Sequence, residues 1–174
     1  MLLIMIKVKR TEILNHIQSE QKIERMAYEI LEKHAEEKKI ILAGIANRGF
    51  KLASILEKKL KSISKKKVLL VEVGVDKRNP FMKNPSIDCS VDEIKNFSVV
   101  VVDDVLNSGR TMLFAMNPFL NIPIHSLSVA VLCNRSYRDF PVEANFVGLS
   151  LSTTLQERIE VEISDSGKIN AYLV

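Results

Sequence analysis

Apolar side chains recur three and four positions apart in several stretches of the chain, and this spacing predicts amphipathic helices. The longest stretch spans residues 21–37, with Ser19 in position to serve as its N-cap. A second stretch spans residues 50–60. A third spans residues 110–119, where Pro118 is expected to end or kink the helix.

Shorter apolar runs separate these helices and predict strands. Glutamates alternate with apolar residues at 159–163, which predicts a half-exposed strand. The turn residues 165–168 allow residues 169–173 to return as its hairpin partner. The remaining runs are mostly or almost continuously apolar, which is typical of buried strands. They lie at residues 1–8, 40–45, 68–73, 99–102, 127–133 and 145–149.

Strands and helices alternate along the chain, which is typical of βαβ units. We therefore expect an α/β fold with a mostly parallel central sheet flanked by helices. The sequence contains no repeat or low-complexity linker, so residues 1–174 are expected to form one domain. Residues 74–96 follow neither period, and a loop of that length in a compact domain is usually functional or mobile. Ligands of such sheets bind beyond the carboxyl ends of the strands.

Composition narrows the class of protein. Of the 174 residues, 47% are apolar and 26% are charged, which is typical of a globular protein and not of a disordered one. No apolar run reaches the roughly 18–20 residues that cross a bilayer, so we expect no membrane partner. Cys89 and Cys133 have no metal-ligand or disulfide pattern, so we expect free thiols in a reducing cytoplasm and no dedicated metal site. Lysines in residues 58–67 form either a solvated surface or a patch for an anion such as RNA.

Two acids, Asp103 and Asp104, directly follow the apolar run 99–102. Adjacent carboxylates can accept hydrogen bonds from the neighbouring hydroxyl groups of a sugar. Residues 107–111 then supply hydroxyl groups and a glycine at a predicted helix start, where backbone N–H groups and the helix dipole favour an anion. Together they suit a ribose with a 5′-phosphate. A capped strand followed by an ordinary turn is the alternative interpretation.

Residues 99–111 read Val-Val-Val-Val-Asp-Asp-Val-Leu-Asn-Ser-Gly-Arg-Thr. This segment resembles the phosphoribosyl-pyrophosphate signature of the type I phosphoribosyltransferase family, in the version carried by its PyrR branch of pyrimidine-attenuation regulators and uracil phosphoribosyltransferases. The resemblance implies that Asp103 and Asp104 hold the ribose 2- and 3-hydroxyls. It implies a 5-phosphate site made by Asn107, Ser108, Gly109, Arg110 and Thr111. It also implies a homodimer or larger assembly, and Mg²⁺ that is bound through the substrate.

A second candidate site is the turn at residues 44–49, after the apolar run 40–45. A planar guanidinium and a glycine at a helix start can hold a diphosphate, although an ordinary βα turn has the same pattern. The turn resembles the pyrophosphate loop of the family. The resemblance implies pyrophosphate binding by Ala46, Asn47, Arg48 and Gly49, with an unusual backbone near Ala46 and Asn47. Asp103, Asp104 and Arg48 are then the expected catalytic residues.

The resemblance covers roughly residues 18–163 and assigns the rest of the site. The loop at about 74–96 would be a mobile lid, from which Lys77 and Arg78 reach the diphosphate. A small hood would be built from the N-terminus and residues 134–174. The resemblance implies base contacts from Arg135, Val147, Gly148 and Leu149.

Departures from the family pattern bear on the base. Asn107 replaces the acid that purine transferases usually carry, but it also differs from the tyrosine that uracil-type members often carry, while Leu149 and Ser152 replace a usual lysine and proline. From the resemblance to the PyrR branch we expect a Mg²⁺-dependent transferase that converts a pyrimidine base, uracil, to UMP and pyrophosphate. One alternative is an RNA-binding regulator with weak or no catalysis, in which residues 58–67 with Arg135 and Arg138 form the patch. A purine-type transferase is the other.

Overall fold

The computed structural model describes residues 10–76, 79, 81 and 83–174. The strand expected at residues 1–8, with Lys77 and Arg78, lies outside the described residues. The helices are α1 (His16–Lys33), α2 (Arg48–Ile63), α3 (Val91–Ile94) and α4 (Arg110–Leu120). The strands are β1 (Thr11–Leu14), β2 (Lys39–Ile45), β3 (Lys67–Gly74), β4 (Ser86–Ile87), β5 (Ser98–Leu106), β6 (Ser126–Arg135), β7 (Phe146–Leu151), β8 (Ile159–Ile163) and β9 (Ile169–Leu173).

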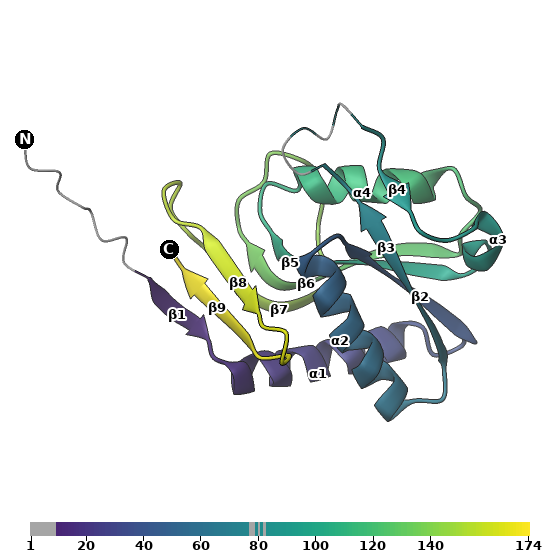
Figure 1. Ribbon diagram of the computed structural model, residues 1–174, viewed down its shortest axis with the longest axis horizontal. Coiled ribbons are helices and arrows are strands. Elements are labelled where there is room, and N and C mark those ends of the chain that lie inside the picture. The colour runs from purple at the N-terminus through teal and green to yellow at the C-terminus, as the bar shows by residue number, and fades with distance from the viewer. Residues whose placement is uncertain (1–9, 77–78, 80, 82) are drawn as a thin grey trace, which may run out of the picture.

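The central sheet has six strands in the order β4-β3-β2-β5-β6-β7. All its pairs are parallel except β3 with β4, which is antiparallel at one edge. Strand β5 lies between β2 and β6, so its carboxyl end is in the middle of the sheet edge. The expected α/β fold with a mostly parallel sheet flanked by helices is confirmed (Figure 1).

Helices cover both faces of this sheet (Figure 1). Val100 and Val102 of β5 pack in the hydrophobic core that includes α1 and α2. Val99 and Val101 pack in a second core with Met112, Ala115 and Phe119 of α4. Because side chains alternate between faces along a strand, a continuous apolar run is what a doubly covered strand needs.

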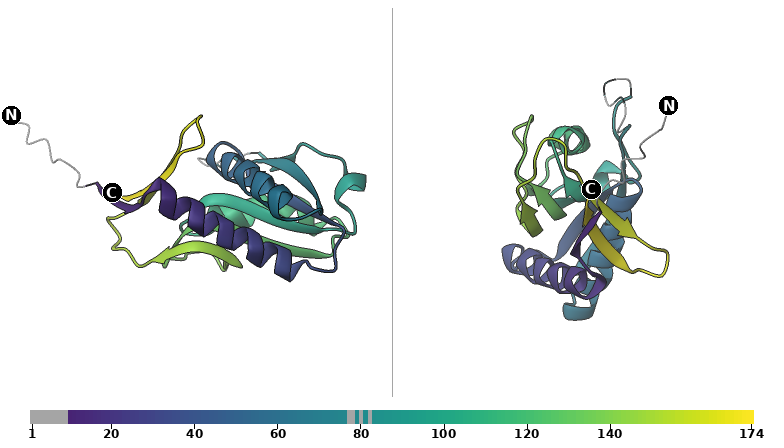
Figure 2. Two further views of the ribbon diagram at one scale, coloured as in Figure 1. Left: turned by 90° about the horizontal axis from the view of Figure 1, so that it is seen from below. Right: turned by 90° about the vertical axis from the view of Figure 1, so that its left-hand side faces the viewer.

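A second, antiparallel sheet has the strand order β1-β9-β8. The predicted hairpin is confirmed, since Ile163 pairs with Ile169 and Ile159 with Leu173. Strand β1 adds to it from the start of the chain, so the two ends of the described chain lie side by side (Figure 2). Contacts of β8 with α2 and β5 bring this sheet to the carboxyl ends of the central strands.

Two details differ from the expectations. Helix α1 begins at His16 and ends at Lys33, before the expected residue 37, and it is capped by Asn15, not by Ser19, which is buried within the helix. Asn15 forms a capping box, since its Oδ1 accepts from Gln18 N at 2.9 Å and its N–H donates to Gln18 Oε1 at 3.0 Å. This first turn was missed because it is polar and places Ile17 in solvent. The segment 74–96 also contains β4 and α3.

Pro118 lies inside α4, which ends at Leu120 shortly after it. Among the described residues, no helix has the length and apolar character needed to cross a bilayer.

Candidate active site at the carboxyl end of β5

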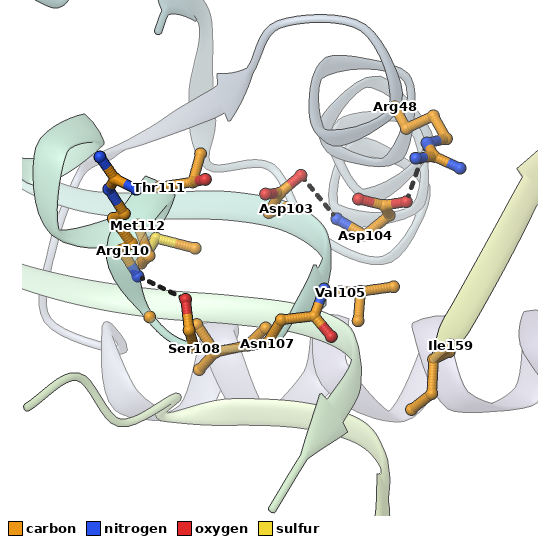
Figure 3. Close-up of a pocket in the computed structure, with 12 residues that line it drawn as sticks. Arg48, Asp103, Asp104, Val105, Asn107, Ser108, Arg110, Thr111, Met112 and Ile159 are labelled. Carbon is orange, nitrogen blue, oxygen red and sulfur yellow. Dashed lines mark hydrogen bonds and ion pairs between the residues drawn. The ribbon is translucent and has the colours of Figure 1, made fainter. Parts of the chain in front are cut away.

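Strand β5 carries Asp103 and Asp104 to the edge of the sheet. Pairing with β6 continues past both acids, with Asp103 opposite Val131 and Val105 opposite Cys133, so their backbone is held in the strand. The two residues are only 5% and 4% exposed. They line a cavity of about 160 Å³ whose other walls are Arg48, residues 105–112 and Ile159 of β8 (Figure 3).

The far side of the cavity is the loop that leads into α4. Gly109, with φ of 87°, is the N-terminal cap of this helix in the left-handed conformation that favours glycine. Gly109 has no side chain to cap α4, and Arg110 N donates to Ser108 Oγ only at a long 3.4 Å, so N–H groups of the first turn can still turn to an anion. The structure thus brings Ser108, Arg110 and Thr111 into the same cavity as the two acids.

Arg48 is the first residue of α2 and closes the other end. Its Nε lies 3.1 Å from Asp104 Oδ2, and its Nη1 donates to Val161 O of β8 at 3.1 Å. Figure 3 shows this guanidinium over Asp104 on the side away from Ser108 and Arg110. The half-exposed guanidinium of Arg48 therefore connects the start of α2 with the end of β5 and with β8 of the second sheet.

The turn before Arg48 has the unusual backbone that was expected there. Asn47 has φ of 69° and ψ of −111°, and Asn96 is the other non-glycine residue with positive φ in the described part of the chain. The structure also shows why position 49 is a glycine, which the sequence did not reveal. A Cβ at this position would lie 2.8 Å from both Asp103 Oδ1 and Val102 O, so only glycine lets α2 approach β5 this closely.

The sequence model of the phosphoribosyl transferase domain matches residues 9–163. The chain belongs to the type I phosphoribosyltransferase family. It is 32% identical over 173 residues to the bifunctional protein PyrR of Streptococcus thermophilus, covering 96% of this chain and 98% of that protein. It is 34% identical over 168 residues to the bifunctional protein PyrR of Streptococcus mutans, covering 93% and 95%. The resemblance to the PyrR branch is thereby confirmed.

Solved structures of phosphoribosyltransferases share the fold. A hypoxanthine-guanine phosphoribosyltransferase of Bacillus anthracis superimposes with a TM-score of 0.67 at 21% identity, over 84% of each chain. A hypoxanthine phosphoribosyltransferase of Staphylococcus aureus gives 0.68 at 16% identity, over 81% of this chain and 77% of that one. At these identities the likeness supports the phosphoribosyltransferase fold and not a choice of base.

The four residues expected to contact the base do not line the cavity. Arg135, almost buried, donates to Thr153 Oγ1 and, at 2.6 Å, to Thr154 O. The carbonyl oxygens of Val147 and Gly148 accept from Arg25 Nη2 of α1 at 2.8 and 2.9 Å. Leu149 pairs with Cys133 in the sheet. These hydrogen-bonding groups already have partners within the protein.

Cys133 belongs to β6, which lies beside the strand that carries the two acids, and it is fully buried. Burial, with a smaller contribution from the charge of Asp104, raises the pKa of its thiol to about 12. The thiol therefore stays protonated at neutral pH and is no nucleophile for the site. The expectation of free cysteines is confirmed for Cys89 and Cys133.

Asp103 and Asp104 can be tested as candidate ligands for Mg²⁺ by the chemistry of their side chains. Nowhere in residues 10–76, 79, 81 and 83–174 do three or more His, Cys, Asp or Glu side chains gather as a metal cluster. Mg²⁺ prefers oxygen ligands and is usually held by one or two carboxylates together with substrate phosphates and water. Asp103 and Asp104 fit that mode, in which the substrate supplies further ligands.

Proposed function

We propose that this protein transfers the 5-phosphoribosyl group of 5-phosphoribosyl-1-pyrophosphate to a pyrimidine base, uracil, and releases UMP and pyrophosphate. The observation that carries the proposal is the shared cavity. Two almost buried carboxylates, the N-terminus of α4 and two arginines, Arg48 and Arg110, lie around a space of about 160 Å³. Diol, monophosphate and diphosphate each have a complementary group there.

In this proposal the carboxylates of Asp103 and Asp104 accept hydrogen bonds from the ribose 2- and 3-hydroxyls. Residues 107–111 bind the 5-phosphate through backbone N–H groups and the hydroxyls of Ser108 and Thr111. The sugar is thereby held at both ends, which fixes the direction of its anomeric carbon. Arg110 is available to the same phosphate, since it also lines the cavity.

Arg48 is the proposed ligand of the pyrophosphate, together with the turn Ala46, Asn47 and Gly49. Its planar guanidinium can form two parallel hydrogen bonds to phosphate oxygens. To do so it would exchange its contacts with Asp104 and Val161 for contacts with the substrate. Lys77 and Arg78 remain predicted lid ligands of the same group.

The reaction breaks the bond between the anomeric carbon and the pyrophosphate oxygen, and a ring nitrogen of the base forms the new bond. The base gives its N–H proton to water, and the electron pair of the broken bond leaves with pyrophosphate. Mg²⁺, when bound, neutralises part of the charge of the diphosphate. Arg48 stabilises the departing anion, while Asp103 and Asp104 orient the sugar.

Uracil is proposed on the resemblance to the PyrR branch and on Asn107, which lines the cavity where purine transferases usually carry an acid. The predicted base contacts are Arg135, Val147, Gly148 and Leu149. These residues do not line the cavity, so they would have to contact the base outside it. A cytoplasmic location and a homodimer or larger assembly belong to the same proposal.

The test is an assay of radiolabelled uracil with the donor and Mg²⁺, run beside cytosine, hypoxanthine and guanine. Formation of UMP, and little product from the purines, is the expected result. If no base yields a nucleotide, the enzymatic proposal is wrong. If only a purine gives a nucleotide, the proposal that uracil is the substrate is wrong, but the proposal that the protein is a transferase holds.

RNA binding is a second candidate function, favoured by one surface. Five lysines line a groove with Phe97 at the amino ends of β2, β3 and β5, opposite the edge that carries the acids: Lys38, Lys39, Lys65, Lys66 and Lys67. Cations beside an aromatic ring suit a phosphate backbone with stacked bases. Arg135 and Arg138, expected in the patch, instead donate to oxygens of the protein itself.

This candidate is tested by titrating single-stranded RNA at increasing salt. Replacing Lys65 and Lys67 with glutamine is expected to weaken binding similarly for all sequences and to reduce the salt dependence. Absence of binding at low salt would exclude it.

A further inference from the structure

The loop between β6 and β7 lies directly against the loop that leads into α4. The N–H groups of Asp139 and Phe140 both donate to Ser108 O, at 3.1 and 3.0 Å. Phe140 and Val142 also border Gly109, where an added Cβ would meet Phe140 O at 3.1 Å. Residues 136–145 are all described and none of them lines the cavity. They therefore contact the loop 107–111 on its side away from the cavity.

Arg138 is at the centre of this contact. Its Nη1 donates to the carbonyl oxygens of Asn107 and, at 3.3 Å, Leu106, which belong to the phosphate side of the cavity. The two N–H groups of this nitrogen are shared with two further acceptors, Arg135 O and, at 2.8 Å, Tyr137 O. The side chain thus spans the end of β5 and the end of β6.

The remaining donors of Arg138 hold its own loop. Nε donates to Val142 O at 3.1 Å, and Nη2 donates to Asn134 Oδ1, whose amide nitrogen donates to Ser150 Oγ of β7 at 3.2 Å. All six acceptors of Arg138 are neutral carbonyl oxygens. A rigid guanidinium with five N–H donors can serve several such acceptors at once, whereas an ammonium group has three donors on a flexible stem.

We propose that Arg138 is a positioning residue for the 5-phosphate of the donor. By binding the carbonyl oxygens of Leu106 and Asn107 from behind, it holds the peptides of residues 107–111 so that their N–H groups can face the cavity. This inference rests on the proposed phosphoribosyl transfer, but its structural part concerns the ligand-free protein. Arg138 itself does not touch the cavity, so its effect is exerted through the loop.

Hydrogen exchange of the ligand-free protein tests the structural part. Arg138→Gln is compared with Arg25→Gln, because Arg25 also donates to two main-chain carbonyls, those of Val147 and Gly148, but on α1. We expect faster exchange in a peptide covering residues 106–113 for Arg138→Gln and no change there for Arg25→Gln. Equal exchange of that peptide in wild type and Arg138→Gln would overturn the inference.

Calorimetry with the donor and Mg²⁺ tests the functional part. Arg138→Gln is expected to weaken donor binding about 10- to 100-fold, since a phosphate loop that is no longer held in place must be ordered when the donor binds. In steady state the KM for the donor should rise more than kcat falls. Unchanged donor affinity in Arg138→Gln would overturn the positioning role, while absence of heat with the wild type would instead overturn the proposed function.

Arg138→Lys covers the case in which the glutamine variant does not fold. It retains the charge and loses the planar fork, so we expect intermediate exchange and donor affinity about 3- to 10-fold below that of wild type. Wild-type exchange and affinity in this folded variant would show that charge alone suffices, which contradicts the inference.

Discussion

Arg48 Nε lies 3.1 Å from Asp104 Oδ2, so the first residue of α2 meets the end of β5 across the cavity. The same guanidinium donates to Val161 O of β8 at 3.1 Å. Without a ligand, the proposed pyrophosphate ligand therefore neutralises one of the two proposed ribose ligands. On substrate binding, Arg48 would instead bind the pyrophosphate and Asp104 would instead bind the ribose hydroxyls.

Replacing Arg48 with alanine is expected to reduce activity more than stability. The Arg48 side chain is 53% exposed but that of Asp104 only 6%, so loss of the pair leaves a poorly solvated carboxylate and should lower the free energy of unfolding by about 1–3 kcal/mol. Loss of a group that stabilises the leaving anion should reduce kcat/KM about 100-fold or more. Arg158→Ala is the control, since Arg158 pairs with Glu160 at 3.0 Å outside the cavity lining. Similar kinetics for the two variants would contradict the role of Arg48.

Gly49→Ala should displace Asp103. The new methyl group would lie 2.8 Å from Asp103 Oδ1 and Val102 O, and main-chain oxygen of a central strand cannot move away cheaply. We expect a loss of stability of about 1–3 kcal/mol together with loss of donor binding. Gly74→Ala is the control, because its Cβ meets the side-chain Oγ of Ser86 at 2.7 Å, which can rotate. Thermal unfolding and donor titration of both variants measure the difference.

Gly109→Ala should affect both stability and the phosphate site. Its φ of 87° costs a non-glycine residue about 1 kcal/mol, and its Cβ would also press on Phe140 O at 3.1 Å. Gly167 has a similar φ of 82° with nothing within 4 Å of an added Cβ, so Gly167→Ala isolates the cost of the backbone conformation. Urea unfolding should show the larger loss for Gly109→Ala, and only this variant should weaken donor binding. Equal effects would mean that the contact with Phe140 is unimportant.

Glu37→Gln should lower stability in a pH-dependent way. Burial acts to raise the pKa of Glu37, but hydrogen bonds from the Ser98 hydroxyl, His34 and the Ser98 N–H outweigh it, so the pKa lies below its ordinary value. A carboxylate with a lowered folded pKa stabilises the protein fully above its unfolded pKa of about 4.3, and this stabilisation is lost as pH falls through the folded pKa.

The expected destabilisation by Glu37→Gln is about 1–3 kcal/mol at pH 7, and it should shrink as the pH falls below about 4. Urea unfolding at several pH values measures it. Glu36→Gln is the control, because Glu36 is exposed and adjacent in sequence. A difference between Glu37→Gln and wild type that persists unchanged at low pH would disprove the charged hydrogen-bond explanation.

Local patterns were sufficient for most of the fold and for one half of the site. The apolar run of β5 predicts its burial because both faces of the strand are covered, by α1 and α2 on one side and α4 on the other. The acids and the phosphate loop are neighbours in the chain, so their cavity follows from one segment, residues 103–111. The unusual backbone at Asn47 was anticipated differently, from the resemblance of its turn to the pyrophosphate loop of the family.

Contacts between distant segments were beyond such patterns. Arg48 reaches Val161, 113 positions away, and Arg138 reaches Leu106, 32 positions away. Gly49 is needed because of Asp103, which belongs to another element. Periodicity reports which face of a helix or strand is apolar, but hydrogen bonds and close packing between elements depend on how those elements are placed in space. The wall made by residues 103–111 was therefore determined by the sequence alone, whereas the far wall at Ile159 and the groups that hold the walls in place were set only by the tertiary structure.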